Sequence, residues 1–476
     1  MLDGLEIVEL RLSEVLEGND TQRIDSEFFN KKSLYFDKLL KTKKYFYLEN
    51  VVSGPFGSTL KSHSYLDKGV AFVRVENLKD KFIIKKDTLV YISDENNLLL
   101  KNSQLFLNDL VMSKVGNTIG LIARVDEEIG TCNISENNLG IKLLNFIDSE
   151  KFYILVYLNS LYSQNLILRR ISGNAQPKLN VGDMKKIPIP VVSNSFQLKI
   201  QELVKLSQNK IEQSKKFYSE AENLLLTELD LLNFKPSNEN IAIKSFSESF
   251  EVSGRLDSEY YQPKYDEIID KVKSTKYDIL DNVVNIQKSI EPGSDAYQES
   301  GIPFVRVSNI TKFGLSSPDI HLSKTLFDDE VLEKLQPKKD TILLSKDGTV
   351  GIAYNVKKNT NFITSGALLH LTIKSKYKEK IFSEYLTLIL NSLVVQMQSQ
   401  RDAGGSIIKH WKPSEIGEVL IPIIDSKTQT QIEEKIKKSF KLKEESRQLL
   451  ELAKKAVEMA IEQDETQAKK LINEQI

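Results

Sequence analysis

Two short stretches combine an arginine with acidic residues, a set that could move protons or hold a cation. They read RIDSEFF from Arg23 and RLDSEYY from Arg255. A third stretch, SKVGNTIG from Ser113, carries glycines that could cradle a phosphate. Structural explanations are stronger for all three. The acidic residues suit the first turn of a helix, and the glycines lie between two strands, where a hairpin turn is expected and not the helix N-terminus that a phosphate needs.

Other catalytic signatures are missing from the sequence. It contains no Gly-Lys dipeptide for a Walker A loop, no HExxH, no Gly-x-Ser-x-Gly elbow, and neither DPPY nor NPPF of an adenine methyltransferase. The single cysteine, Cys132, excludes an intramolecular disulfide and a cysteine zinc site, and four scattered histidines leave little for a metal cluster. We therefore expect no catalysis from this chain alone, and no cofactor or metal of its own.

Side chains suited to nucleic acid gather in two loops. Residues 151–190 carry six basic side chains and one acidic one, and the loop ISGNAQPKLN lies within them. There Asn174 and Gln176 could read base edges, while Lys178 could meet phosphate. A second loop, RDAGGSIIKHWK, contains Arg401, Lys409, His410, Trp411 and Lys412. Both loops are candidate DNA-binding segments.

Further candidate DNA contacts lie outside these loops, and several have a second interpretation. Arg74 and Arg306 could contact DNA, or could point to solvent or to a structural carboxylate. Lys114 and Lys346 could touch phosphate or be solvated, and Trp411 is more often a packing residue than a base-stacking one. The remaining candidates are Lys61, Asn77 and Asn117 in the first half of the chain, and Asn309 and Thr349 in the second.

The two loops occupy equivalent places in an internal duplication. Arg23 and Arg255 lie 232 positions apart, and the same interval relates GVAFVRVEN to GIPFVRVSN, SKVGNTIG to SKDGTVG, and LNSL at Leu158 to LNSL at Leu390. A shared interval over so much of each half indicates two copies of one domain. The landmarks are kept between the copies while the loops diverge, as expected of two readers of two different short sequences.

Each copy predicts the same order of elements. It opens with a helix (Asp25 to Leu40; Asp257 to Val272) and continues with short strands such as AFVRV, LVMSK and GLIARV, or PFVRV, TILLSK and LLHLTI. A second helix follows (Tyr153 to Arg170; Ser383 to Arg401), then the polar loop and an extended IPIP or LIPI segment. This is an α+β domain, and at 476 residues the chain has room for two of them.

A long helix follows each copy, from about Ser195 to Phe234 and from about Lys427 toward the C-terminus. Each has an apolar seam at spacings of three and four residues. The expected segments are therefore 1–194, 195–235, 236–426 and 427–476. Pairing the helices antiparallel, with approximate two-fold symmetry, would bury both seams. The alternative is that each helix folds back on its own domain.

These landmarks resemble the specificity (S) subunits of type I restriction-modification systems. The resemblance rests on SGPFGSTLKS, the FVRVEN and FVRVSN strands, the SKVGNTIG and SKDGTVG turns, and the path through IPIPVV or LIPII into a long helix. It implies two target recognition domains, each reading half of a split sequence in double-stranded DNA. It also implies as partners two modification methyltransferase subunits, which carry S-adenosylmethionine, and restriction subunits. GPFGS has no clean match in the second copy.

The leading hypothesis is a non-catalytic DNA-specificity subunit of a bacterial defence system. The alternative is a coiled-coil adaptor whose end domains bind proteins and not DNA. An acidic N-terminus and the absence of any run of 18 apolar residues predict a cytoplasmic protein without a membrane partner.

Overall fold

The computed structural model describes residues 8–16, 19, 23–55, 59–79, 81–173, 177–239, 241–405 and 408–475. The chain divides into two compact units. Unit 1 consists of Met1–Lys210 and Glu444–Ile476, and unit 2 of Ile211–Lys443. Both combine helices with mostly antiparallel sheets, which confirms the predicted α+β class. No helix in the described ranges is both long and apolar enough to cross a membrane.

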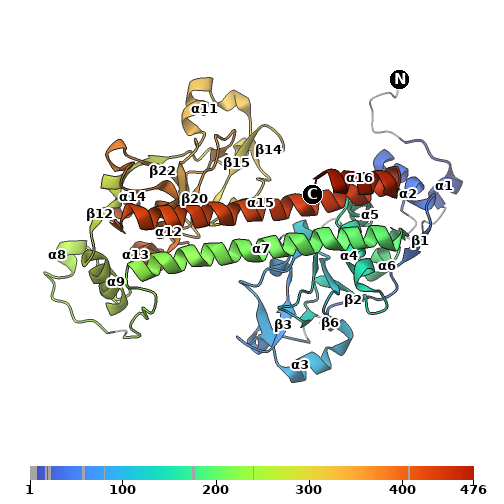
Figure 1. Cartoon of the computed structure of the whole chain (residues 1–476), viewed down its shortest axis with the longest axis horizontal. Helices are drawn as coiled ribbons and strands as arrows, with labels where there is room; N and C mark the ends of the chain where they lie inside the picture. The colour runs from blue at the N-terminus through green and yellow to red at the C-terminus, as the bar shows by residue number, and fades with distance from the viewer. Residues whose placement is uncertain are drawn as a thin grey trace. The chain divides into compact units, whose positions relative to one another are not determined.

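Unit 1 contains an α+β domain and parts of both long helices (Figure 1). Its elements are α1 (Leu12–Leu16), α2 (Lys31–Lys41), β1 (Tyr45–Tyr47), β2 (Val51–Ser53), β3 (Val70–Val73), β4 (Phe82–Ile83), β5 (Val90–Ile92), α3 (Asp94–Leu99), β6 (Leu105–Phe106), β7 (Leu110–Ser113), β8 (Ile122–Arg124), β9 (Thr131–Ile134), β10 (Asn138–Ile141), α4 (Asp148–Leu158), α5 (Leu161–Arg169), α6 (Val181–Met184), β11 (Pro188–Pro190), the first part of α7 (Asn194–Glu228), the last part of α15 (Ser426–Glu462) and α16 (Glu465–Gln475).

Unit 2 contains the second α+β domain and the remaining parts of α7 and α15. Its other elements are α8 (Phe250–Ser253), α9 (Pro263–Lys273), β12 (Tyr277–Ile279), α10 (Leu280–Val283), β13 (Val284–Lys288), β14 (Tyr297–Gln298), β15 (Ile302–Val305), β16 (Ile310–Thr311), β17 (Gly314–Leu315), β18 (His321–Leu322), α11 (Asp329–Leu335), β19 (Ile342–Ser345), β20 (Ala353–Asn355), β21 (Ile363–Thr364), β22 (Leu368–Ile373), α12 (Ser383–Asn391), α13 (Leu393–Asp402), α14 (Pro413–Gly417) and β23 (Leu420–Pro422).

The two units share one sheet topology. The main sheet has the order β2-β10-β7-β8 in unit 1, with β4 added at its edge, and β13-β22-β19-β20 in unit 2. A second sheet holds a parallel pair, β3 with β9 or β15 with β21. The strand before each long helix, β11 or β23, pairs antiparallel with β1 or β12. The common order confirms the predicted duplication.

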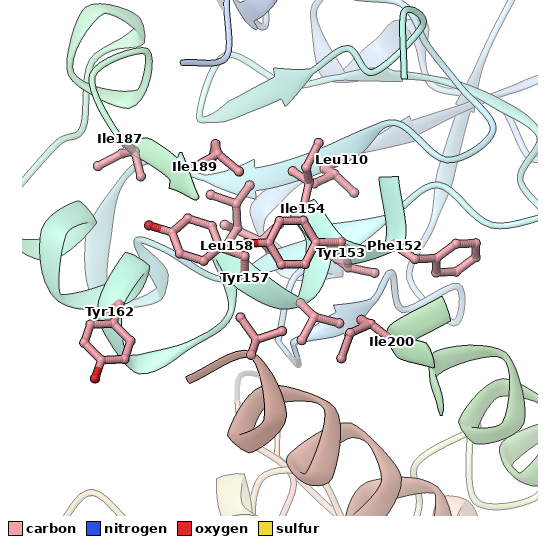
Figure 2. Close-up of a cluster of buried hydrophobic side chains, with 14 of the residues drawn as sticks. Leu110, Phe152, Tyr153, Ile154, Tyr157, Leu158, Tyr162, Ile187, Ile189 and Ile200 are labelled. Carbon is pink, nitrogen blue, oxygen red and sulfur yellow. The ribbon is translucent and has the colours of Figure 1, made fainter. Parts of the chain in front are cut away.

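At the centre of unit 1 lies the helix α4, which is buried on all sides after its first turn. Every residue of α4 from Phe152 to Leu158 is buried, so the helix packs against the sheet on one side and against α7 on another. Figure 2 shows Tyr153 and Tyr157 of α4 between Ile187 and Ile189 above and Ile200 of α7 below. This cluster joins the α+β domain of unit 1 to the long helix.

Two tyrosine hydroxyls satisfy the carbonyl groups that this packing buries. Tyr153 Oη donates to the carbonyl of Pro190 at 2.8 Å, and Tyr157 Oη donates to that of Pro188 at 2.6 Å. In unit 2, Tyr385 Oη donates to Pro422 at 2.7 Å. Burial raises the pKa of all three phenols, so they remain neutral donors.

The first predicted helix of each copy begins later than expected. The sequence predicts helices from Asp25 and Asp257, but α2 begins at Lys31 and α9 at Pro263. Asn30 caps α2 by accepting a hydrogen bond from the Ser33 amide at 2.8 Å. A proline occupies the first turn of α9, where its missing N–H costs nothing. The charged motif therefore precedes the helix and does not belong to it.

The second predicted helix of each copy is two helices. α4 ends at Leu158 and α5 begins at Leu161, while α12 ends at Asn391 and α13 begins at Leu393. Asn159 causes the first break, because its amide donates both to Leu155 within α4 and to Ile122 of β8, at 2.9 and 3.3 Å. Asn391 makes the equivalent bonds to Thr387 and Ala353.

The long helices pair antiparallel within each unit, as predicted. In unit 1, Ser207 of α7 bonds Ser446 of α15 at 2.8 Å, and Lys210 bonds Glu445 at 2.6 Å. In unit 2, Ser214 bonds Ser439 at 3.1 Å, and Lys435 bonds Glu220 at 2.6 Å. α7 ends at Glu228, short of the predicted Phe234, and a break after Glu462 separates α15 from α16.

The apolar seam is buried where it packs on a domain, and between those stretches it also contains buried serines. Ile200, Val204, Tyr218, Ala221 and Leu225 are buried on α7, as are Ile432, Ile436, Ala453 and Val457 on α15. The predicted seam residue Leu232 lies beyond the end of α7 and is 49% exposed. The buried serines were not predicted. Ser207 and Ser439 occupy equivalent positions of the duplication, as do Ser214 and Ser446.

We predict that Tyr153→Phe destabilises the protein by ~1–3 kcal/mol, because it leaves a buried carbonyl without a donor. Urea unfolding of the full chain measures the change. Tyr35→Phe is the matched control, since Tyr35 also lies in unit 1 and is 59% exposed; it is expected to change stability little. Equal stability of the Tyr153→Phe variant and the wild type would show that water or backbone movement satisfies Pro190.

A buried histidine makes the stability of unit 2 depend on pH. His370 lies on β22, is 4% exposed, and has its Nε2 2.8 Å from Thr364 Oγ1. Burial lowers the pKa of His370 to about 4. Above the ordinary value of 6.5 neither the folded nor the unfolded state carries the proton. As the pH falls below 6.5, the unfolded state binds a proton that the folded state does not bind. The free energy of unfolding therefore decreases between pH 6.5 and about pH 4.

We predict that His370→Gln removes this loss. At pH 5 the histidine costs up to ~2 kcal/mol relative to pH 7, from a difference of about 1.5 pH units at ~1.36 kcal/mol each. Urea unfolding at the two pH values, compared between wild type and variant, measures the difference. His63→Gln, at an exposed position in unit 1, is the control and should retain the full pH dependence.

Candidate nucleic-acid interface

In both units the divergent loop is attached to a turn that follows a central strand. In unit 1 this turn follows β7 and begins at Lys114, whose carbonyl accepts from the Leu179 amide at 3.0 Å. Val115 and Lys178 form a β-bridge, and Ser172 and Lys178 form another that closes the base of the loop. The loop is thus held at its stem by backbone bonds, independent of its side chains.

Unit 2 repeats this frame bond for bond. The Lys346 carbonyl accepts from the Trp411 amide at 2.8 Å. Asp347 and His410 form one β-bridge, and Gly404 and His410 the other. Each of these residues lies 232 positions after its equivalent in unit 1. The backbone frame is therefore conserved between the copies while its side chains differ.

A glycine permits the turn in both units. Gly116 and Gly348 have φ values of +68° and +73°, in the left-handed region that glycine adopts readily. Their amides donate to the carbonyls of Pro177 and Lys409 in the loop, at 3.4 and 2.9 Å. The strand-turn-strand interpretation of SKVGNTIG is confirmed, since β7 and β8 pair antiparallel on either side of it.

The charged motif that opens each copy supports the other end of the loop. Arg23 binds the Asp25 carboxylate at 2.7 and 2.8 Å, and its Nη1 donates to the carbonyls of Arg169 and Ile171. This pairing raises the pKa of Arg23 and lowers that of Asp25. In unit 2, Arg255 binds Asp257 and donates to the carbonyl of Asp402 at 2.8 Å. The motif is therefore a structural anchor and not the first turn of a helix.

An aromatic ring lies between two guanidinium groups at each anchor. In unit 1, Phe28 has Arg23 at 5.0 Å and Arg169 at 4.1 Å from its centre. In unit 2, Tyr260 has Arg255 at 4.5 Å and Arg401 at 5.1 Å. Cation–π contacts of this kind hold the chain just before the loop. Arg401, a predicted DNA contact, is thus part of the anchor and also pairs with Asp402.

The predicted contacts of unit 1 fall into three groups. Lys61, Asn117 and Lys178 are exposed. Lys114 is 7% exposed and donates to Ser53 Oγ; burial lowers its pKa, and the charge of Lys178 lowers it further. Asn77 is buried and is used inside the fold: it accepts from the Arg74 amide and donates to Thr88. Asn174 and Gln176 lie outside the described residues.

Arg74 combines structural contacts with access to a cavity. Its guanidinium lies 5.3 Å from the ring centre of Tyr65, donates to the Thr88 carbonyl and pairs with Glu76. A cavity of about 310 Å³ adjoins it, lined also by Ser135. The structural-carboxylate interpretation of Arg74 is therefore supported, while its 27% exposed side chain still faces open space.

In unit 2 the exposed predicted contacts lie at the loop and its turn. These are Thr349, Lys409, His410 and Lys412. Lys346 is half-buried and pairs with Asp347. Arg306 pairs with Asp319 at 3.0 Å, and Asn309 is buried and caps the Arg306 amide. Trp411 is 1% exposed, so the packing interpretation holds.

Two residues that the sequence did not single out belong to these surfaces. Ser53 receives the Lys114 ammonium group, and Asp347 joins Lys346 to His410. The alignment of the two copies gave a signal for Asp347, because a carboxylate stands there where the first copy has Val115. Nothing in the sequence marked Ser53. Among the described residues, no three His, Cys, Asp or Glu side chains gather to hold a metal ion.

The fold has solved counterparts of low sequence identity. No family model and no curated protein sequence matches the chain. The S subunit of a type I restriction-modification system from M. genitalium matches with a TM-score of 0.36 and 15% identity, covering 90% of this chain and 96% of that one. The chain is similar to type I specificity subunits.

Two further solved structures also match the chain. A chain from a structure describing complex assembly and conformational transition of the type I R-M system matches with a TM-score of 0.27 and 12% identity, over 90% of this chain and 96% of that one. The HsdS subunit from Thermoanaerobacter tengcongensis matches with a TM-score of 0.27 and 13% identity, over 83% and 90%.

We predict that Arg23→Lys loosens the loop of unit 1, since one ammonium group cannot replace the paired bonds to Asp25 and the bonds to two carbonyls. Hydrogen exchange at the Ser172 and Lys178 amides, which close the loop, should accelerate about fivefold or more, equivalent to ~1 kcal/mol. Arg11→Lys, at an exposed position in the same unit, should leave both rates unchanged. Unaltered exchange in the Arg23→Lys variant would show that the β-bridges hold the loop without the anchor.

Proposed function

We propose that this chain is a non-catalytic subunit that recognises a split sequence in double-stranded DNA. Each unit reads one half of the target through its divergent loop and the adjoining turn. The partners are two copies of a modification methyltransferase, which supplies S-adenosylmethionine, and restriction subunits. The complex works in the cytoplasm as a type I restriction-modification system.

One observation carries this proposal. Both units hold a loop on the same backbone frame, but the side chains on that frame differ at nearly every exposed position. A domain whose duplicated copies had one shared ligand would keep those side chains. Two readers of different base sequences must instead change them, because sequence is read by side chains at base edges while phosphate contacts set position.

The exposed side chains of the loops suit this role. Lys178 in unit 1, and Lys409, His410 and Lys412 in unit 2, are cationic or hydrogen-bonding groups on the surface. Cations of this kind meet phosphates, and the duplicated form offers two equivalent places for two copies of one partner. Lys61 and Asn117 extend the proposed contact set of unit 1, and Thr349 extends that of unit 2.

We predict that replacing residues 23–194 by the equivalent domain of a relative changes one half of the methylated DNA sequence and leaves the other half unchanged. The matched exchange of residues 255–426 should change only the other half. Methylome sequencing of a host that expresses each chimaera with the cognate methyltransferase measures both outcomes. A change in both halves, or in neither, contradicts the proposal.

DNA binding by the complex with the methyltransferase separates this function from that of a protein-binding adaptor. Binding through phosphates weakens as salt increases, with a slope of roughly −0.9 for each phosphate contact. Absence of any salt-dependent binding would favour the adaptor.

A further inference from the structure

At the base of the loop, the two units place different chemistry on one frame. The positions occupied by Val115 and Lys178 in unit 1 are occupied by Asp347 and His410 in unit 2. Each pair forms the same β-bridge between turn and loop, so the backbone cannot account for the difference. The change replaces Lys178, which forms no ion pair with another described residue, by a histidine in contact with a carboxylate.

The carboxylate of Asp347 links two side chains. One oxygen lies 2.8 Å from His410 Nδ1, and the other accepts from the Lys346 ammonium group. Asp347 is sheltered, with 23% of its side chain exposed, whereas the His410 side chain is 62% exposed. The sheltered acid thus holds an exposed ring, the arrangement expected of a residue that positions another.

This contact determines what the imidazole offers. In its neutral form, a ring that donates Nδ1–H to a carboxylate keeps Nε2 as an acceptor. In unit 1 the equivalent Lys178 has three donors and no acceptor, and Val115 cannot hold it. Lys114 is likewise directed to Ser53 and not to an acid. One unit therefore offers donors at this place, and the other offers an acceptor.

We propose that Asp347 is a positioning residue that makes His410 a specificity determinant of unit 2. His410 accepts a hydrogen bond from an exocyclic amino group, that of adenine or cytosine, in the major groove of its half-site. Lys178, at the same place in unit 1, donates to guanine or to phosphate. This inference rests on the proposed function and specifies which base chemistry each unit selects.

The test exchanges the side chains between units on their shared frame. His410→Lys, alone and with Asp347→Val, gives unit 2 the side chains of unit 1. With the methyltransferase present, we expect discrimination at one base pair of the second half-site to fall by about 5- to 150-fold, the range for a good base contact. Discrimination throughout the first half-site should not change. Binding of duplexes substituted at each position, together with methylome sequencing, measures both.

Two variants of Asp347 separate positioning from folding. Asp347→Asn keeps an oxygen that can accept from Nδ1, so it should retain discrimination to within about threefold. Asp347→Val removes the acceptor, so it should lose discrimination as fully as His410→Lys does. Hydrogen exchange at the Trp411 amide, which bonds the Lys346 carbonyl, checks that the loop remains attached. If both Asp347 variants behave alike while the loop is intact, the positioning role is overturned.

The outcomes also distinguish this inference from the function on which it rests. If domain exchange alters one half of the target but His410→Lys leaves the second half unchanged, only the inference fails. If His410→Lys changes the affinity for all duplexes by one common factor and alters the salt slope, His410 contacts phosphate. That result would also overturn the inference. If the wild-type complex reads no split sequence at all, the proposed function itself fails.

Discussion

Each unit depends on one helix that is buried along most of its length. This helix is α4 in unit 1, buried from Phe152 to Leu158, and α12 in unit 2, buried from Glu384 to Leu390. In unit 1 the sheet, the IPIP strand and the long helix each cover part of α4. The same burial would leave proline carbonyls without hydrogen bonds, and Tyr153, Tyr157 and Tyr385 supply them. The domain and its portion of the long helices therefore fold as one body. A shift of either within its unit would expose apolar surface or leave a buried carbonyl without a hydrogen bond.

The contacts that fix the divergent loop to this rigid core are separate from the side chains that the loop exposes. The chain before the loop is fixed by an arginine anchor and an aromatic ring between two guanidinium groups, and the chain after it by a backbone bond to the lysine turn. None of these contacts uses a side chain at the tip of the loop. The exposed residues can consequently change without a cost to folding, as loops on a rigid scaffold generally do.

The sequence was informative where a pattern repeats and uninformative where contacts are distant. The interval of 232 residues predicted the duplication, the strands and the lysine turns, because equivalent folds place equivalent residues at equal intervals. The sequence did not predict where the helices end. Asn159 and Asn391 end their helices through bonds to strands about 37 residues away, and such bonds leave no local trace. The same limit applies to the site: Asn77 and Asn309 look like base readers in sequence, but both are buried caps. Ser53 was missed because its partner lies 61 residues away.

A duplicated domain can acquire two different surfaces without acquiring two different folds. Changes within the core would cost stability in one copy only, and changes in the loop frame would move every contact at once. Substitution at the β-bridge avoids both costs, since Val115 and Asp347 share a backbone conformation but differ in charge. A single sheltered carboxylate can then convert a basic surface into one that holds an acceptor, because it cancels the neighbouring lysine and orients the imidazole at the same time. The frame thus allows large changes in surface charge and hydrogen-bonding groups from few substitutions, provided that they fall on residues whose backbone is already fixed.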